Sequence, residues 1–360
     1  MRAEVKSVVV MAGGTGGHVF PALAVAEALR ARGIAIHWLG TRAGIEADLV
    51  PARGFAITYL DVSGVRGQGL ARLLLAPFKV ARAVLAAMRV LRAVRADAVI
   101  GLGGYVTGPG GVAARLLGLP LFIHEQNAIA GFTNRLLARM ATQVLEAFPG
   151  AFPAAPKVHC VGNPVRADIA ALPAPAERFA GRDGALRILV LGGSQGAVAL
   201  NELVPEALAL LARQQPLTIR HQAGRRNQDK AVAKYAAVGL AAEVLPFIDD
   251  MAAMYGWADL VICRSGALTV SELAAAGVGA VLIPFPHAVD DHQTANGRYL
   301  SEAGAALLFA QSTLTAERLA EALSPLFVRD RLLAMATAAR DLAQPQATAR
   351  VVAACLGENA

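Results

Sequence analysis

Two glycine-rich segments of similar sequence are the first places in this chain where chemistry can be expected. GGTGGH at 13–18 follows the apolar run 7–12, and GGSQGA at 192–197 follows the apolar run 187–191. Glycines between a strand and a helix let the backbone approach a ligand closely, and the helix N-terminus favours an anion. A tight turn of any α/β protein looks similar, but the repetition favours phosphate binding.

The glycine pattern disfavours two common classes of nucleotide-binding protein. Neither segment fits G-x-G-x-x-G followed by a ribose-binding acid, the pattern of dinucleotide-dependent redox enzymes. G-x-x-x-x-G-K-[ST] does not occur, so the chain is not a P-loop NTPase. A third glycine-rich turn, GGYVTG at 103–108, follows another predicted strand over 97–102.

His18 distinguishes the first glycine-rich segment from the second, which has Ala197 at the same position. The dipole at a helix N-terminus disfavours an imidazolium, so a neutral ring at pH 7 could accept a proton from a hydroxyl. A capping or packing histidine is the alternative. We therefore treat His18 as a candidate general base.

The second half carries a further candidate site. RSGALTVSE at 264–272 follows a strand, and its small residues would expose backbone donors for a diphosphate. Glu272 lies inside the following helix and could accept both ribose hydroxyls, although a lone Glu more often lies on a solvated face. The polar loop 284–296 suits sugar hydroxyls, and a metal site at its Asp-Asp-His is disfavoured because no fourth ligand is evident.

Apolar β-branched runs alternate with Ala- and Leu-rich helical stretches along the chain, which predicts an α/β fold with parallel sheets. The pattern predicts two Rossmann-like domains, and a Pro- and Ala-rich linker at 172–185 lies between them. We assign 1–165 to an N-terminal domain, 166–344 to a C-terminal domain and 345–360 to a helix that returns to the first. The predicted strands are 7–12, 36–39, 97–102, 119–124, 158–162, 187–191, 217–222, 259–263 and 280–284.

Composition limits the class of protein. With 55% hydrophobic and 17% charged residues the chain is globular, and its 3 distant cysteines argue against a disulfide framework. The mean hydropathy is +0.47, but the long uncharged stretch 98–114 is interrupted by glycines and a proline. Neither a membrane span nor a signal peptide is predicted, so we expect the chain to stay in the cytoplasm.

The net charge of +7 is confined to the first half. Residues 1–165 contain 17 Lys and Arg against 8 Asp and Glu, whereas residues 166–360 contain 17 against 19. A basic half implies an anionic partner such as nucleic acid, an acidic membrane or a phosphorylated substrate.

Residues 70–95 form a basic amphipathic stretch whose main helix is expected to begin at Pro77. Its charges are all cations and alternate with apolar residues, as in a helix that lies on an anionic membrane. A helix that only covers a sheet would not need six cations. Nucleic acid is disfavoured because the stretch holds one aromatic residue and no binding module. The proposed membrane contacts are Arg72, Leu74, Leu75, Phe78, Lys79 and Arg82.

Seven motifs occur in order along 13–296: GGTGGH, GGYVTGPGG, HEQNAIAG, VGNPVR, GGSQGA, RSGALTVSE and DDHQTAN. With them the chain resembles, over essentially its whole length, the MurG family of bacterial peptidoglycan glycosyltransferases. The resemblance implies a GT-B fold, in which two Rossmann-like domains face each other across a cleft. It also implies GlcNAc transfer from UDP-GlcNAc to the C4 hydroxyl of MurNAc in lipid I, with inversion, giving lipid II.

The resemblance assigns roles by motif. His18 is the implied base, and Glu125 lies beside the same cleft as a second catalytic candidate. Residues implied to bind the acceptor are Gly14, Thr15, Gly104 and Tyr105. Residues implied to bind the donor are Thr15, Gly16, Gly17, Asn127, Arg166, Ser194, Ile248, Ala267, Leu268, Thr269, Val270, Ser271, Glu272 and Gln293.

The implied partners are UDP-GlcNAc as a substrate, undecaprenyl-linked lipid I, the anionic cytoplasmic face of the inner membrane and other cell-wall synthesis proteins. No cofactor, essential metal or nucleic acid is expected. Two alternatives remain at this point: a UDP-GlcNAc epimerase of the same architecture, and a membrane-bound UDP-sugar-binding module without catalysis.

Overall fold

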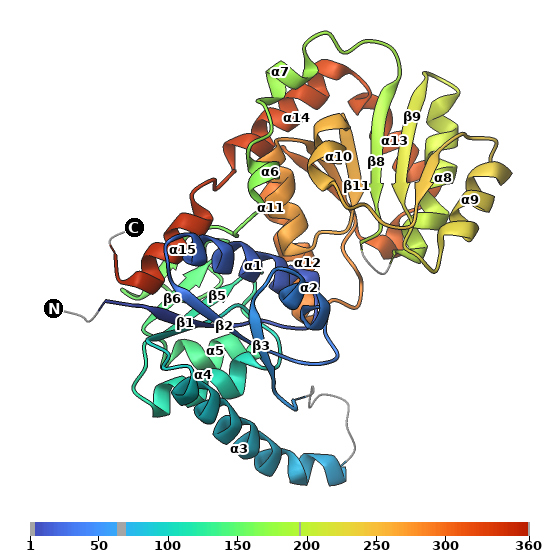
Figure 1. Ribbon diagram of the computed structural model, residues 1–360. Coiled ribbons are helices and arrows are strands. Elements are labelled where there is room, and N and C mark those ends of the chain that lie inside the picture. Colours follow the sequence, from blue (N-terminus) through green and yellow to red (C-terminus); the bar gives the residue numbers. More distant parts are fainter. Residues whose placement is uncertain (1–3, 63–69, 194–195, 359–360) are drawn as a thin grey trace. The chain divides into compact units, whose positions relative to one another are not determined.

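The computed structural model describes residues 4–62, 70–193 and 196–358, with the side chains of residues 70–76 and 289 left aside. The chain divides into two compact units (Figure 1). Unit 1 contains Met1–Arg166 and Pro345–Ala360, and unit 2 contains Ala167–Gln344. Both bounds lie within one residue of those expected from the sequence.

Unit 1 is built on a parallel seven-stranded sheet of order β3-β2-β1-β4-β5-β6-β7. Its strands are β1 Ser7–Met11, β2 Ala35–Gly40, β3 Ala56–Tyr59, β4 Ala98–Gly101, β5 Leu121–Glu125, β6 Gln143–Glu146 and β7 Val158–Cys160. Its helices are α1 Gly16–Ala31, α2 Glu46–Ala52, α3 Leu70–Ala93, α4 Thr107–Leu116, α5 Phe132–Ala138 and α15 Ala347–Leu356.

Two apolar cores cover the two faces of this sheet. Because successive strand residues point to opposite faces, Val8 and Val10 enter one core while Val9 and Met11 enter the other. The first core includes residues of α1 and α15, so the C-terminal helix completes unit 1. The second includes residues of α3 and α4.

Unit 2 repeats the plan with a parallel six-stranded sheet of order β10-β9-β8-β11-β12-β13. Its strands are β8 Leu186–Leu191, β9 Leu217–Gln222, β10 Glu243–Leu245, β11 Leu260–Cys263, β12 Gly279–Leu282 and β13 Ala306–Leu308. Its α-helices are α6 Ala167–Ala170, α7 Pro175–Phe179, α8 Val198–Ala212, α9 Gln228–Ala237, α10 Met251–Trp257, α11 Ala267–Ala276, α12 His292–Ser301, α13 Ala316–Leu323 and α14 Arg329–Asp341. Three single 3₁₀ turns are η1 Val289–Asp291, η2 Gln311–Thr313 and η3 Ser324–Leu326.

The α/β prediction is confirmed, and each strand expected from the sequence is present with ends that differ by two residues at most. The sequence analysis missed β3, β6, β10 and β13. These strands have only three or four residues, too few for a period-two pattern to stand out.

The predicted start of the basic helix at Pro77 was wrong. Helix α3 begins at Leu70, so Pro77 lies inside it. Proline lacks an N–H and therefore removes one hydrogen bond from the second turn of the helix. The remaining hydrogen bonds and the packing of the later turns on α4 stabilise the helix despite this loss.

Candidate functional site

Each sheet has one point at which the strand order reverses, and ligands of open α/β sheets bind outside the carboxyl ends of the strands at such points. In unit 1 this point lies between β1 and β4, and in unit 2 it lies between β8 and β11. Both glycine-rich segments and the turns after β4 and β11 therefore lie at switch points. The segments singled out from the sequence are the ones that the topology selects.

In unit 1 the turn after β4 packs directly on the turn after β1. A Cβ atom on Gly104 would lie 2.5 Å from the backbone oxygen of Gly13. A Cβ atom on Gly103 would lie 2.4 Å from Nδ1 of His18. Both positions also have positive φ, +107° at Gly103 and +86° at Gly104, which favours glycine. Only glycine allows this approach.

A buried carboxylate that the sequence analysis missed, Glu46, binds the backbone of the first glycine turn. Glu46 is fully buried, and its oxygens accept hydrogen bonds from the backbone N–H of Gly14 at 2.9 Å and from the N–H and hydroxyl of Thr41 at 2.8 and 2.7 Å. A Cβ atom on Gly13 or Gly44 would lie within 2.5 Å of a carboxylate oxygen of Glu46. Glu46 thus positions the turn that precedes α1.

His18 belongs to a chain of hydrogen bonds that enters the protein interior. Its Nδ1 lies 2.8 Å from Oε1 of Gln126, and Nε2 of Gln126 lies 3.0 Å from Nδ1 of His124. Nε2 of His124 lies 2.9 Å from the backbone oxygen of Gly162. Burial lowers the pKa of His124 to about 4, so this ring is neutral near pH 7. Neither Gln126 nor His124 was singled out from the sequence.

Glu125 lies between His124 and Gln126 in the sequence, but its side chain binds other partners. One carboxylate oxygen accepts from the backbone and side-chain amides of Asn127 at 3.0 and 3.2 Å. The other accepts from the N–H of Gly131 at 3.0 Å and the side-chain amide of Asn134 at 2.9 Å. Because Glu125 is 2% exposed and holds four donors, the geometry favours a positioning role for it over the catalytic role expected from the sequence.

The other expected residues of unit 1 lie around the same turns. Gly14 and Thr15 are exposed, Gly16, Gly17 and Asn127 are half-buried, and no side chain caps the N-terminus of α1. Tyr105 is 63% exposed on the second turn. Arg166 ends unit 1, with its guanidinium 5.9 Å from the centre of the Phe20 ring in the second turn of α1.

In unit 2 the turn after β11 leads into α11, which carries the expected donor residues Ala267, Leu268, Thr269, Val270, Ser271 and Glu272. Glu272 is 6% exposed, and one of its oxygens accepts from the hydroxyl of the buried Tyr255 at 3.1 Å. Tyr255 is a positioning contact that the sequence analysis missed. Ser265 is fully buried before the helix, and its hydroxyl has no hydrogen-bond partner among the described residues.

Arginines hold the opposite end of α11. Arg178 donates to the backbone oxygens of Ala276 and Gly277, and Arg340 donates to that of Ala275. Burial lowers the pKa of Arg178 to about 10, which leaves it charged at neutral pH. The helix dipole favours cations at a helix C-terminus, so these arginines stabilise the C-terminal end of α11. The N-terminal end of α11 lies at the switch point.

The remaining expected donor residues have different surroundings. Gln293 accepts from the backbone N–H of Phe285 at 2.8 Å, and Ile248 is 5% exposed. Ser194 lies outside the described residues. Asn296, in the loop expected to bind sugar hydroxyls, is fully buried and donates to the backbone oxygen of Ser265, so it holds the turn rather than facing a ligand.

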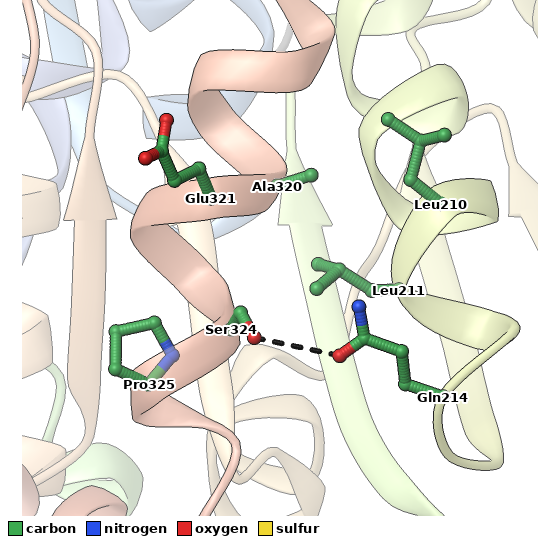
Figure 2. A pocket seen from close by; sticks show the side chains of 7 residues that line it. All are labelled: Leu210, Leu211, Gln214, Ala320, Glu321, Ser324 and Pro325. Carbon is green, nitrogen blue, oxygen red and sulfur yellow. Dashed lines mark hydrogen bonds between the residues drawn. The ribbon is translucent and has the colours of Figure 1, made fainter.

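A pocket of unit 2 lies away from these turns, between α8 and α13 (Figure 2). At 1.5 Å per residue along α8, it is roughly 20 Å from the glycine turn at the N-terminus of that helix. A hydrogen bond from Ser324 to Gln214 crosses it. It therefore does not belong to the switch-point site. Its lining residues are Leu210, Leu211, Gln214, Ala320, Glu321, Ser324 and Pro325.

Within the described ranges, no group of three or more His, Cys, Asp or Glu is arranged to hold a metal ion. Helix α3 exposes Phe78 to 76% and also exposes Lys79 and Arg82. Arg82 pairs with Asp61, an anion from outside the helix, at 3.3 Å. The side chains of Arg72, Leu74 and Leu75 lie outside the described part. In that part no helix has the length and apolar character of a membrane span.

Comparisons with known proteins agree with this geometry. Models of the glycosyltransferase family 28 N-terminal and C-terminal domains match residues 8–146 and 187–351. The UDP-N-acetylglucosamine--N-acetylmuramyl-(pentapeptide) pyrophosphoryl-undecaprenol N-acetylglucosamine transferases of Marinobacter nauticus and Aeromonas hydrophila are 56% and 55% identical to this chain over 96% and 97% of it, and over 96% of their own lengths. The crystal structure of Acinetobacter baumannii MurG superposes with a TM-score of 0.85 and is 48% identical, covering 97% of this chain and 99% of its own.

The two parallel-sheet α/β units and the matches to both family 28 domains define a glycosyltransferase of the GT-B class. The chain belongs to glycosyltransferase family 28 and, within it, to the MurG family.

The sequence predicts that Glu272 accepts the ribose hydroxyls of UDP. Loss of a charged acceptor costs about 1.5–3 kcal/mol, so Glu272→Ala should weaken UDP binding roughly tenfold or more in calorimetry. Tyr255→Phe removes a contact of Glu272 but keeps the carboxylate, so its effect should stay within about threefold. Unchanged UDP affinity in Glu272→Ala would exclude Glu272 from the site.

Proposed function

We propose that this chain transfers GlcNAc from UDP-GlcNAc to the C4 hydroxyl of MurNAc in lipid I, giving lipid II for peptidoglycan synthesis. The identity with named transferases along almost the whole chain carries this proposal. The switch-point turns support it, because they offer one candidate base and two helix N-termini suited to anionic groups.

In the proposed reaction a single displacement inverts the anomeric centre. His18 takes the proton of the acceptor hydroxyl as its oxygen forms a bond to the anomeric carbon. The bond from that carbon to the UDP oxygen breaks, and UDP leaves with the electron pair. The N-terminus of α11 favours the diphosphate charge that develops, and Glu272 holds the ribose.

The residues around the turns take the remaining roles in this proposal. Gly14, Thr15, Gly104 and Tyr105 face the acceptor, while Thr15, Gly16, Gly17, Asn127 and Arg166 contact the donor from unit 1. Ser194, Ile248, Gln293 and residues 267–272 hold the donor from unit 2. Glu125 acts by holding the loop that carries Asn127.

The direct test incubates the pure protein with radiolabelled UDP-GlcNAc, with and without a short-chain lipid I analogue. We expect label in the lipid product, and release of UDP that depends on the acceptor. Conversion of UDP-GlcNAc to another UDP-sugar without acceptor would indicate an epimerase. Binding of intact UDP-GlcNAc without turnover in either case would indicate a binding module.

The proposed base gives a second prediction. His18→Ala should lower kcat by about 10²–10⁴-fold, because a positioned general base contributes that much, while UDP affinity is retained. His159→Ala, an exposed histidine of β7, serves as the control and should keep the parent kcat. A His18→Ala kcat within a few-fold of the parent value would exclude His18 as the base.

We also propose that the chain lies peripherally on the cytoplasmic face of the inner membrane and contacts it through α3. Phe78, Lys79 and Arg82 are exposed there, and Arg89 and Arg92 are exposed further along the helix. Cations near an anionic surface contribute on the order of 1 kcal/mol each, and salt screens them. Exposed Val80 and Leu85 add apolar area.

Charge reversal tests this membrane contact. Changing Arg72, Lys79 and Arg82 to Glu should abolish sedimentation with anionic liposomes, while transfer to a soluble acceptor is retained. The matched control changes three exposed cations of unit 2, Arg213, Lys230 and Arg331, to Glu and so alters net charge equally. If the α3 variant sediments with the liposomes as well as the parent does, α3 is not the membrane contact and only covers the sheet.

A further inference from the structure

The side chains that link His18 to the interior of unit 1 fix the direction of every hydrogen bond between them. This series of hydrogen bonds begins at the backbone oxygen of Gly162, which can only accept a hydrogen bond. Nε2 of His124, 2.9 Å away, must therefore carry a proton. Since burial keeps the second proton off this ring by lowering its pKa to about 4, Nδ1 of His124 has a lone pair and can only accept.

The orientation of the Gln126 amide follows from this acceptor. Its nitrogen donates to Nδ1 of His124 at 3.0 Å and to the backbone oxygen of His124 at 3.1 Å, which uses both of its hydrogens. The reversed amide would place its oxygen against two acceptors in an environment where Gln126 is 1% exposed. Unpaired acceptors are costly at such burial, so the orientation is fixed.

The oxygen of Gln126 therefore faces Nδ1 of His18, 2.8 Å away, and can only accept from it. We propose that Gln126, held by His124 and the carbonyl of Gly162, is a positioning residue that keeps the proton of neutral His18 on Nδ1 and leaves Nε2 as the nitrogen that accepts the substrate proton. This inference deepens the proposed function. The role of Nε2 as proton acceptor rests on the proposed function, but the position of the proton on the His18 ring does not depend on it.

Gly103 fixes the place of the ring in the same arrangement. A Cβ atom at this position would lie 2.4 Å from Nδ1 and 2.6 Å from Cε1 of His18, so the imidazole lies against the bare glycine backbone. Gly103 is itself held by a hydrogen bond of 2.8 Å from the hydroxyl of Thr107 to its carbonyl. Gly103 thus limits where the ring can lie, and Gln126 determines which nitrogen carries the proton.

This arrangement differs from the Ser-His-Asp triad, in which a carboxylate orients the histidine and stabilises the imidazolium that forms. Here the partner is a neutral amide. It selects the tautomer by accepting one hydrogen bond and adds no formal charge beside the ring. The nearby carboxylate of Glu125 is directed to Asn127, Gly131 and Asn134 instead.

The first experiment measures the tautomer directly in the parent protein. Histidine labelled with ¹⁵N in the ring distinguishes protonated from unprotonated nitrogens by chemical shift, and the His18 signals are assigned by their loss in His18→Ala. We expect the proton of neutral His18 on Nδ1. A proton on Nε2 in the parent protein would overturn the inference whatever activity the protein has.

The second experiment uses a variant of Gln126. Gln126→Leu removes the acceptor, so part of the His18 population should carry the proton on Nε2, and kcat should fall about tenfold or more with the KM for UDP-GlcNAc little changed. The tautomer and the separate effects on kcat and KM distinguish this positioning role from a loss of fold, because a loss of fold would also weaken the binding of UDP-GlcNAc.

The matched control removes the partner of another histidine in the same unit. Thr58→Val deletes the hydroxyl that lies 2.9 Å from Nε2 of His37, and kcat should stay at the parent value. If Gln126→Leu keeps the parent tautomer and kcat, Gln126 has only a structural role. Failure of the proposed function would instead appear as a parent protein with the expected tautomer and no transfer.

Discussion

Backbone crowding at the carboxyl ends of β1 and β4 is the constraint on which unit 1 depends. The two turns approach so closely that a single added carbon at Gly104 would meet the carbonyl of Gly13 at 2.5 Å. This contact fixes the entry to α1, and therefore the position of the N–H groups at its start. It also brings Gly103 against His18, so the approach that forms the turn before α1 also sets the position of the imidazole.

Unit 2 meets the same constraint with different partners. A Cβ atom on Gly196 would lie 2.3 Å from the carbonyl of Ala223, and one on Gly192 would lie 2.8 Å from the nitrogen of Ala197. Here the glycine turn packs on the segment after β9 instead of on a second glycine turn. Two half-buried arginines, Arg178 and Arg340, hold the C-terminal end of α11, whereas small residues form the turn at its N-terminal end. The two units thus share a topology, but the residue that follows the glycine-rich turn is His18 in unit 1 and Ala197 in unit 2.

Local pattern was sufficient for much of the fold and of the site. Apolar runs of four to six residues predicted strands, and glycines after them predicted the turns, because both signals lie within a short stretch of sequence. Glu46 gave no such signal, since an acid in the first turn of a helix usually faces solvent. Its burial depends on Gly14, 32 residues away, and on the space left by Gly13 and Gly44. Likewise, His18 and Gln126 are 108 residues apart, and only the fold brings them together.

The alternation of side chains along β5 explains why adjacent polar residues act differently. His124 and Gln126 lie on one side of the chain and reach His18, whereas Glu125 lies on the other side and reaches Asn134 on α5. Two carboxylates of this region, Glu46 and Glu125, are therefore engaged by backbone and amide donors, and His124 is neutral and buried. Among these four titratable side chains, His18 is the one whose second nitrogen has no hydrogen-bond partner in the described part of the chain. Glu46, Glu125 and His124 are buried, so in the proposed reaction the substrate proton goes to a single atom of this group, Nε2 of His18.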